Sequence, residues 1–503
     1  MRDHRPLVIV SLPADTVEEA REMIERARAA GADLAEVRFD RFAPAEIERA
    51  RELFPAPLPL VATLRSRIEG GAGPDDPPER ARILDRLAEL PFRWIDLEKD
   101  RDRESDLHLP PSTGLGRIVS THRTEPASPP EWSGWVREAP TGAAVRKVVV
   151  PASVGQLFEE LLPGLPPPGE NTLVVMTTGA SGPLFRAFSA RLGFPFVYAA
   201  LPEPRGSTST PAPVEPSQIS VDRLRPFLDA GPEAPLFALA GHPVAHSRSP
   251  ALHSRWMREG ELAGLYVALD FASEEEFVGS LPRLAEWGFR GLNVTHPLKS
   301  AALEVATEVG PGAEACGVAN CLTLRDGEIA AENTDLVAIL RRLEELKETN
   351  RWDGRELAIL GTGGAARATL VAARTMGARA RLYGRRAEPT NALARQFGAE
   401  PAMSADARPE GLVVHATDVG RTGTGPLELP LRSLVRSTTH VIDWVYLPSE
   451  PTVRQTVEAA GATYEDGRRL LVYQAAASFG IWWGDEPDPD EITATLREEG
   501  CTA

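Results

Sequence analysis

Two lysines are the first candidates for chemistry, because lysine is almost absent from this chain. Among 503 residues, 55 side chains are lysine or arginine, and only Lys99, Lys147, Lys299 and Lys347 are lysines. Arginine therefore replaces lysine at positions where any surface cation would suffice. A retained lysine suggests a need for an amine whose proton can be exchanged near neutral pH. We expect this of Lys147 and Lys299, and we expect the other two lysines at the surface.

Lys147 lies in the β-branched run V-R-K-V-V-V. Side chains alternate along a strand, so either Arg146 or Lys147 must point inward. Burial beside arginines lowers the pKa of an amine, which would free it as a nucleophile that forms an imine with a carbonyl substrate. His122 could move the protons of such a reaction. The alternatives are a surface lysine that extends its amine to water and a structural histidine; the scarcity of lysine favours the catalytic interpretation.

Other polar residues lie in or just after apolar runs, at the positions where strands would end. They are Glu36, Arg38, Arg65, Glu69, His122 and Arg186. If the strands are parallel, these side chains converge at one edge with Lys147. The arginines could instead be ordinary surface ion-pair partners, which is the commonest fate of arginine.

Lys299 and Asp335 form a plausible proton-transfer pair, because reduction of a ketone by hydride needs a cationic acid beside the developing alkoxide. Lys299 ends the run N-V-T-H-P-L-K, and Asp335 ends N-T-D. The N-T-D run could instead only cap the helix that follows it.

A glycine-rich turn follows the apolar run Glu356–Leu360 and precedes a helical pattern. Gly361, Gly363, Gly364 and Ala365 fit G-x-G-x-x-A, the spacing that lets a backbone approach a pyrophosphate at a helix N-terminus. The next predicted strand ends at Arg385 and Arg386, where a cation favours the 2′-phosphate of NADP(H). Arg386 could instead belong to a basic cluster that caps a helix.

The elements around these residues predict several α/β domains. Residues 1–228 alternate short apolar runs with helical patterns, and eight such units fit a (β/α)8 barrel. The chain then reads as a linker at 229–235, a small α/β domain at 236–335, a Rossmann domain at 336–467 and helices at 468–503 that pack back on the small domain. The predicted barrel strands are Leu7–Leu12, Leu34–Phe39, Leu58–Leu64, Trp94–Leu97, Arg117–Thr121, Val145–Val150, Leu173–Thr177 and Phe194–Ala199.

Composition narrows the partners. A formal charge of −17 argues against nucleic acid and anionic membranes as main partners. No apolar run reaches the roughly 18–20 residues of a spanning helix, so we expect a cytoplasmic protein with small-molecule substrates. Cys316, Cys321 and Cys501 lack the spacing of a zinc or redox site, and no metal is expected. Oligomerisation remains possible.

The first half resembles type I 3-dehydroquinate dehydratase over nearly its whole length. The resemblance is carried by V-S-L at 10–12, E-V-R-F-D at 36–40, R-S-R-I-E-G-G at 65–71, S-T-H at 120–122 and R-K-V at 146–148. It implies that Lys147 forms a Schiff base with the ketone of 3-dehydroquinate, that His122 moves protons and that Glu69 orients His122. The residues implied to hold the substrate are Ser11, Glu36, Arg38, Arg65, Arg186 and Gln218.

One departure from this family falls near the predicted substrate. The family's Ser/Thr-A-P-G-Gln loop reads V-E-P-S-Q here, from Val214 to Gln218. A substrate-contacting hydroxyl is therefore missing or moved to Ser217.

The second half resembles shikimate dehydrogenase from about Leu236 onward. The motifs are G-H-P-V-A-H-S-R-S-P at 241–250, N-V-T-H-P-L-K at 293–299, G-V-A-N at 317–320, N-T-D at 333–335, G-T-G-G-A-A-R at 361–367, D-W-V-Y at 443–446 and Q-A-A-A-S-F at 474–479. The resemblance implies catalysis by Lys299 and Asp335. The residues implied to bind the hydroxylated ring are Ser247, Ser249, Asn293, Thr295, Asn320, Tyr446 and Gln474.

For the cofactor, the resemblance implies NADP(H). It adds Thr417 to the glycine-rich turn and the two arginines, and it places Trp444 and Gly467 beside the nicotinamide. The sequence departs from the family at three positions: Gly384 and His415 each stand in place of asparagine, and Ala338 stands in place of glycine.

The two resemblances support each other, because the product implied for the first half, 3-dehydroshikimate, is the substrate implied for the second. We therefore predict a bifunctional enzyme of aromatic amino-acid precursor synthesis. Two alternatives remain. One is a class I aldolase barrel fused to an NAD-linked quinate dehydrogenase, against which Arg385 and the E-G-G motif speak. The other is a metabolite-sensing regulator that has lost its chemistry, against which the retained Lys147, His122, Lys299 and Asp335 speak.

Overall fold

The computed structural model describes residues 5–102, 114–126, 128–137, 145–166, 172–202, 215–245, 247–420, 427–446, 448 and 452–498. The chain divides into two compact units. The first comprises Met1–Phe237, Pro243–Ala245 and Glu261–Gly288, and the second comprises the remaining residues. In the part of the chain that is described, no helix combines the length and the apolar character that crossing a bilayer requires.

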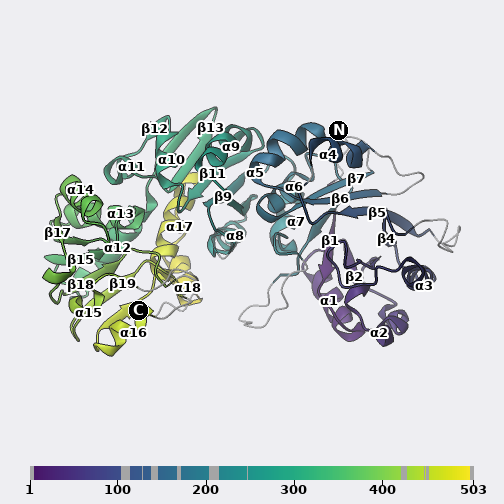
Figure 1. Ribbon diagram of the computed structural model, residues 1–503, viewed down its shortest axis with the longest axis horizontal. Helices are drawn as coiled ribbons and strands as arrows, with labels where there is room; N and C mark the ends of the chain where they lie inside the picture. The colour runs from purple at the N-terminus through teal and green to yellow at the C-terminus, as the bar shows by residue number, and fades with distance from the viewer. Residues whose placement is uncertain are drawn as a thin grey trace. The chain divides into compact units, whose positions relative to one another are not determined.

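Eight parallel strands form the first sheet, in the order β7-β6-β5-β4-β3-β2-β1-β8 (Figure 1). The strands are β1 (Leu7–Leu12), β2 (Leu34–Arg38), β3 (Leu60–Thr63), β4 (Trp94–Glu98), β5 (Gly116–His122), β6 (Val145–Pro151), β7 (Leu173–Thr178) and β8 (Phe196–Ala199). The sheet is nearly closed, although no ladder joins β7 to β8 within the described residues. The predicted barrel is thus confirmed, and every expected strand is present with its ends shifted by no more than two residues.

The helices that follow barrel strands are α1 (Val17–Ala29), α2 (Pro44–Glu48), α3 (Pro77–Ala88), α4 (Pro129–Arg137), α5 (Val154–Gln156), α6 (Gly182–Phe188) and α7 (Val221–Ala230). The apolar spacing of residues 153–162 is typical of a single α-helix. Ser153 does cap α5 by accepting from the backbone N–H of Gln156, but a π-helical turn replaces the α-helix at Leu157–Leu161. Residues 103–113, in the connection from β4 to β5, lie outside the described residues.

The second sheet is mixed, in the order β10-β9-β11-β13-β14-β12. Its strands are β9 (Leu236–Gly241), β10 (Leu265–Asp270), β11 (Phe289–Val294), β12 (Glu308–Val309), β13 (Cys321–Arg325) and β14 (Glu328–Glu332). The accompanying helices are α8 (Ser249–Glu259), α9 (Glu274–Glu286), α10 (Lys299–Glu304), α11 (Pro311–Cys316) and α12 (Thr334–Glu348). A hairpin joins β13 to β14 through Asp326 and Gly327, which both have positive φ.

The third sheet is parallel throughout, in the order β17-β16-β15-β18-β19-β20. The strands are β15 (Glu356–Leu360), β16 (Arg379–Tyr383), β17 (Glu400–Ala402), β18 (Leu412–His415), β19 (His440–Asp443) and β20 (Thr463–Glu465). The helices are α13 (Gly364–Thr375), α14 (Ala387–Phe397), α15 (Leu431–Leu434), α16 (Thr452–Ala459), α17 (Arg468–Trp483) and α18 (Pro489–Glu498). This is the Rossmann strand order, whose direction reverses between β15 and β18, where open sheets of this kind bind their ligands.

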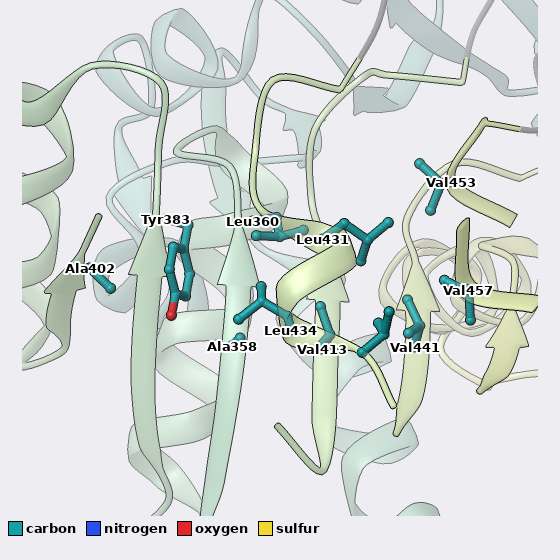
Figure 2. Close-up of a cluster of buried hydrophobic side chains, with 11 residues drawn as sticks. Ala358, Leu360, Tyr383, Ala402, Val413, Leu431, Leu434, Val441, Val453 and Val457 are labelled. Atoms are coloured by element: carbon teal, nitrogen blue, oxygen red, sulfur yellow. The ribbon is translucent and has the colours of Figure 1, made fainter. Parts of the chain in front are cut away.

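One face of the third sheet is covered by an apolar core, drawn in Figure 2. Leu431 and Leu434 of α15 and Val453 and Val457 of α16 belong to this cluster, together with strand residues such as Val413. All five are at most 2% exposed. This packing fixes the ends of β15 and β18, which carry the glycine-rich turn and Thr417.

Candidate active sites

Lys147 points into the barrel, and its amine lies among carboxylates. Its side chain is 5% exposed, and Nζ lies 2.6 Å from Asp96 Oδ2, 4.0 Å from Glu36 Oε1 and 3.4 Å from the hydroxyl of Tyr198. Arg146 turns the other way and donates to the carbonyl of Val136 on α4. Of the two residues that could point inward from this strand, Lys147 therefore does so. The expectation that arginines would surround it was incomplete, because two carboxylates contact the amine.

Arg65 connects the acidic side chains around this lysine. Its Nη2 donates to Asp96 at 2.8 Å, and its Nη1 donates to Glu69 at 2.9 Å, to Glu98 at 3.2 Å and to the Ser120 hydroxyl at 2.9 Å. Burial favours the neutral form of Asp96, but the charges of Arg65 and Lys147 outweigh it and hold the pKa of Asp96 well below its ordinary value. Asp96 is thus a permanent anion that holds both cations in place.

His122, at the end of β5, contacts the carboxylate of Glu69. Glu69 Oε2 lies 3.2 Å from His122 Nδ1 and accepts the backbone N–H of His122 at 3.1 Å. Burial, then the charges of Arg65 and Lys147, lower the pKa of His122 well below its ordinary value, so the imidazole is neutral. Burial raises the pKa of Glu69 to about 7, although Arg65 opposes the shift. When Glu69 is ionised it accepts the Nδ1 proton, which leaves Nε2 of His122 as a base.

The remaining barrel candidates lie on β1, β2 and the segments that follow β7 and β8. Glu36 accepts from the hydroxyls of Ser11 at 2.6 Å and Thr63 at 2.8 Å. Arg38 is held by Asp40 through two hydrogen bonds of 2.7 and 2.8 Å. Gln218 Nε2 reaches the Ser11 hydroxyl at 3.5 Å.

Arg186, the last of these candidates, is buried on α6. Val214, the first residue of the divergent loop, lies outside the described residues.

In the second unit, Lys299 and Asp335 form an ion pair. Asn320 donates to the other oxygen of Asp335 at 3.0 Å and accepts the backbone N–H of Thr334 at 2.7 Å. The helix-capping alternative applies to a different residue, because it is Asn333 that accepts from the backbone N–H of Leu336 at the start of α12. Capping and the ion pair therefore coexist, and the Asp335 carboxylate remains directed at Lys299.

Polar side chains from four further segments belong to the same unit. Asn293, at the end of β11, donates to the Ser478 hydroxyl of α17 at 2.7 Å, and Ser478 lies 3.1 Å from the Thr334 hydroxyl. Ser249 begins α8, and its backbone N–H donates to the Ser247 hydroxyl at 3.2 Å. The other predicted ring-binding residues are Thr295, which is half-buried, Gln474, which is 9% exposed and donates to Leu471, and Tyr446, which is half-buried.

The glycine-rich turn has the geometry that close approach of a ligand requires. Gly361 has φ +118, and a Cβ there would lie 2.5 Å from the carbonyl oxygen of Ala416, so no other residue fits. A Cβ on Gly363 would meet nothing within 4 Å. A Cβ on Gly364, the first residue of α13, would lie 3.0 Å from Lys299 Cδ. The turn therefore brings the anion-binding start of α13 beside the catalytic candidate Lys299.

Arg385 and Arg386 are exposed at the end of β16. Arg386 occupies the N-cap position of α14 without a side-chain capping bond, so the capping alternative is not supported for its guanidinium. The structure also explains Gly384, because a Cβ there would lie 2.1 Å from the Thr390 hydroxyl and 2.9 Å from Thr362 Cγ2.

His415, which stands where the family has asparagine, is the second difference from the family that the structure explains. The fully buried imidazole lies 2.8 Å from Asp443 Oδ1 and 2.6 Å from the Thr417 hydroxyl, and Tyr464 donates to the other Asp443 oxygen at 2.9 Å. His415 thus ties the end of β18 to the end of β19. The two neighbours predicted beside the nicotinamide also lie together, because a Cβ on Gly467 would come within 2.4 Å of the Trp444 carbonyl oxygen.

The two described cysteines, Cys316 and Cys321, are buried, and burial raises the pKa of each thiol to about 12. Neither is a reactive thiolate near neutral pH. Among the residues described, no group of three or more histidine, cysteine or acidic side chains could hold a metal ion.

Comparison with known proteins separates the two halves of the chain. The family model of type I 3-dehydroquinase matches residues 8–231, and the family model of the shikimate dehydrogenase substrate-binding domain matches residues 239–322. The shikimate dehydrogenase (NADP(+)) of Azorhizobium caulinodans is 36% identical over 52% of this chain and 94% of its own length. That of Xanthomonas euvesicatoria is 38% identical over 52% of this chain and 95% of its own length.

A solved structure matches as well. The crystal structure of shikimate 5-dehydrogenase from Thermus thermophilus in complex with NADP(H) and shikimate is 33% identical to this chain. The match covers 53% of this chain and 99% of that one, with a TM-score of 0.48.

Proposed function

Because this chain belongs to the shikimate dehydrogenase family and carries a type I 3-dehydroquinase domain ahead of that half, we propose that it is a bifunctional enzyme of the shikimate pathway. It dehydrates 3-dehydroquinate to 3-dehydroshikimate and then reduces that product to shikimate with NADPH. The observation that carries the proposal is that each half holds a buried or half-buried lysine paired with a carboxylate, Lys147 with Asp96 and Lys299 with Asp335.

In the barrel, the amine of Lys147 adds to the substrate ketone and water leaves to form a protonated imine, which acidifies the neighbouring carbon. Nε2 of His122 then removes a proton from that carbon and returns it to the departing hydroxyl group. Asp96 and Arg65 keep the amine in position, and Glu69 keeps His122 in the tautomer that can act as a base. Water finally hydrolyses the imine and regenerates the lysine. This chemistry needs no metal.

In the second unit, Lys299 donates a proton to the ketone oxygen, and Asp335 holds the ammonium group in position. The ring of the substrate lies against Asn293, Asn320 and the other polar residues of that unit. NADPH, when bound, supplies the hydride. The residues that would hold it are the glycine-rich turn at 361–365, Thr417, Trp444, Gly467 and the two arginines Arg385 and Arg386.

Two alternatives are disfavoured. A metabolite-sensing regulator would have no use for the contacts of Lys147, His122, Lys299 and Asp335 described above. An NAD-linked quinate dehydrogenase would not need a cation such as Arg385 after β16.

The direct test supplies 3-dehydroquinate and NADPH to the full chain and measures shikimate. We also propose that the enzyme acts in the cytoplasm, since its substrates and cofactor are small and its charge is strongly negative.

The dehydratase activity is expected to rise with pH through an apparent pKa of about 7, because an ionised Glu69 accepts a stronger hydrogen bond from Nδ1–H of His122 than a protonated one. Protonation of Glu69 below that pH weakens this hydrogen bond and lowers kcat/KM. The measurement is the pH profile of kcat/KM for 3-dehydroquinate, in the wild type and in Glu69→Gln. Persistence of the same inflection in Glu69→Gln would assign it to another group.

Replacing Arg385 by alanine is expected to raise the KM for NADPH about tenfold. This is the effect expected from losing one hydrogen bond between the charged guanidinium and the 2′-phosphate. The KM for NADH should stay the same, because NADH lacks the 2′-phosphate. Initial rates with both cofactors measure the effect. Arg395, an exposed arginine in the last turn of α14, provides a control of equal charge. Equal loss with NADPH and NADH, or a similar loss in Arg395→Ala, would contradict the assignment.

A further inference from the structure

One cation of the barrel site is neutralised in a different way from the others. Arg38 is held by Asp40, Arg65 by Asp96, Glu69 and Glu98, and Lys147 by Asp96. Asp96 and Glu98 belong to β4, and Asp40 belongs to the turn that directly follows β2. The carboxylate that contacts Arg186 is instead Glu215, which lies in the connection between β8 and α7.

The guanidinium of Arg186 is largely committed to the backbone. Nε donates to the Tyr198 carbonyl at 3.2 Å, and Nη1 donates to the carbonyls of Thr177 at 3.1 Å and Gly182 at 2.6 Å. Nη2 alone remains to bind an anion, and it lies 3.4 Å from Glu215 Oε2. Burial lowers the pKa of Arg186 to about 10, although Glu215 opposes the shift. A guanidinium buried this deeply, with its side chain 3% exposed, is costly unless an anion pairs with it.

Glu215 is held in place from its own loop rather than by the barrel. Its Oε2 accepts the backbone N–H of Ser217 at 3.0 Å and also the Ser217 hydroxyl. Its side chain is 24% exposed, so it can move toward water without crossing the core. Ser217 packs against the start of α6, where a Cβ on Gly182 would lie 2.0 Å from its hydroxyl. The loop therefore presents Glu215 to Arg186.

The same loop carries a second sign of a ligand. The amide oxygen of Gln218 is buried and has no hydrogen-bond partner among the described residues, while its Nε2 reaches Ser11. An unpaired buried acceptor costs free energy unless a ligand supplies the donor. The amide oxygen of Gln218 could therefore accept a hydrogen bond from a ligand hydroxyl group. Gln218 belongs to the loop that presents Glu215 to Arg186, since its backbone N–H donates to the Glu215 carbonyl at 3.1 Å.

We propose that Glu215 is an internal carboxylate that competes with the carboxylate of the substrate for Arg186, and so determines how tightly the barrel binds its anionic substrate. This rests on the proposed dehydratase function, in which we take Arg186, one of the residues expected to hold the substrate, to bind its carboxylate. No bond is made or broken; one anion replaces another on the guanidinium. The replacement of a neutral loop residue by Glu215, noted as part of the V-E-P-S-Q departure, then has a functional consequence.

The test is the KM for 3-dehydroquinate in Glu215→Ala and Glu215→Gln. If Glu215 occupies Arg186 in about nine of ten unliganded molecules, its removal lowers the KM about tenfold. Both variants should show the fall, because glutamine keeps the size of the side chain without its charge. Glu25→Ala is the control, since Glu25 is an exposed carboxylate paired with Arg28 and its loss changes the net charge equally.

A double-mutant cycle locates the effect. In an Arg186→Gln background, Glu215→Ala should produce no further fall in KM, because the contested cation is gone. An equal fall in both backgrounds would show that Glu215 acts elsewhere. An unchanged or higher KM in Glu215→Ala, or a Glu215→Gln protein that behaves as the wild type, would overturn the proposal. The dehydratase activity of the wild type separates failure of the proposed function from failure of this inference. If the wild type does not dehydrate 3-dehydroquinate, both the proposed function and the inference are refuted. If the wild type is active, the KM values of the variants test the inference alone.

Discussion

Lys147→Ala is expected to lose dehydratase activity by roughly 10⁴-fold or more, because no other group of the barrel site can form the imine. The amine points into the barrel among Asp96, Glu36 and Tyr198. Borohydride reduction of the wild type in the presence of 3-dehydroquinate should trap the imine. Mass spectrometry should then find the adduct on the peptide that contains Lys147.

The chain supplies its own controls for this experiment. Lys99 is an exposed lysine directly after β4 of the same barrel, so Lys99→Ala should retain both the adduct and the activity. The Lys147→Ala protein should still oxidise shikimate with NADP⁺, which shows that its second unit has folded. An adduct on another peptide, or substantial dehydration by Lys147→Ala, would refute the imine mechanism.

Lys299→Ala is expected to lower kcat for shikimate oxidation by about 10³-fold, within the range that a general acid contributes. The same proton donor serves both directions of the reaction. Asp335→Asn should also lose activity, because it removes the charge that holds the ammonium group. The effect should fall on kcat more than on the KM for shikimate, since the proton is transferred in the transition state. Initial rates with NADP⁺ measure both quantities.

Lys347, exposed on α12, is the matched lysine in this unit. Lys347→Ala should retain shikimate oxidation, and Lys299→Ala should retain dehydration in the barrel. A Lys299→Ala protein with normal kcat would contradict the assignment of the proton donor. A change confined to the KM would make Lys299 a binding residue instead.

Much of the fold was predictable because the spacing of apolar residues within a short stretch of sequence indicates a strand or a helix. Each barrel strand is short and centres on apolar residues, and in the third sheet the run Glu356–Leu360 leads directly into a glycine turn and α13. Boundaries were less predictable where a helix changes type. The π-helical turn at Leu157–Leu161 has the same apolar spacing as an α-helix over so few residues, so sequence alone could not separate them.

The candidate sites were predictable where a residue type is rare or a motif is specific, as for Lys147 and Lys299. The acidic partners Asp96 and Glu98 were missed. A signal existed, because W-I-D-L-E places both acids on one face of an otherwise apolar strand. Their contact with Arg65 depends on the pairing of β3 with β4, a long-range feature that no local pattern encodes. The same holds for His415 and Asp443, which the pairing of β18 with β19 brings together.

The central claim is that one chain performs two consecutive reactions. The most direct measurement supplies the purified full chain with 3-dehydroquinate and NADPH and follows shikimate by chromatography, together with the oxidation of NADPH. Shikimate should form in the wild type and in equal amount to the NADPH consumed. Lys147→Ala should leave 3-dehydroquinate intact, and Lys299→Ala should accumulate 3-dehydroshikimate. Failure of the wild type to produce shikimate, or its production by the Lys147→Ala protein at the wild-type rate, would contradict the account.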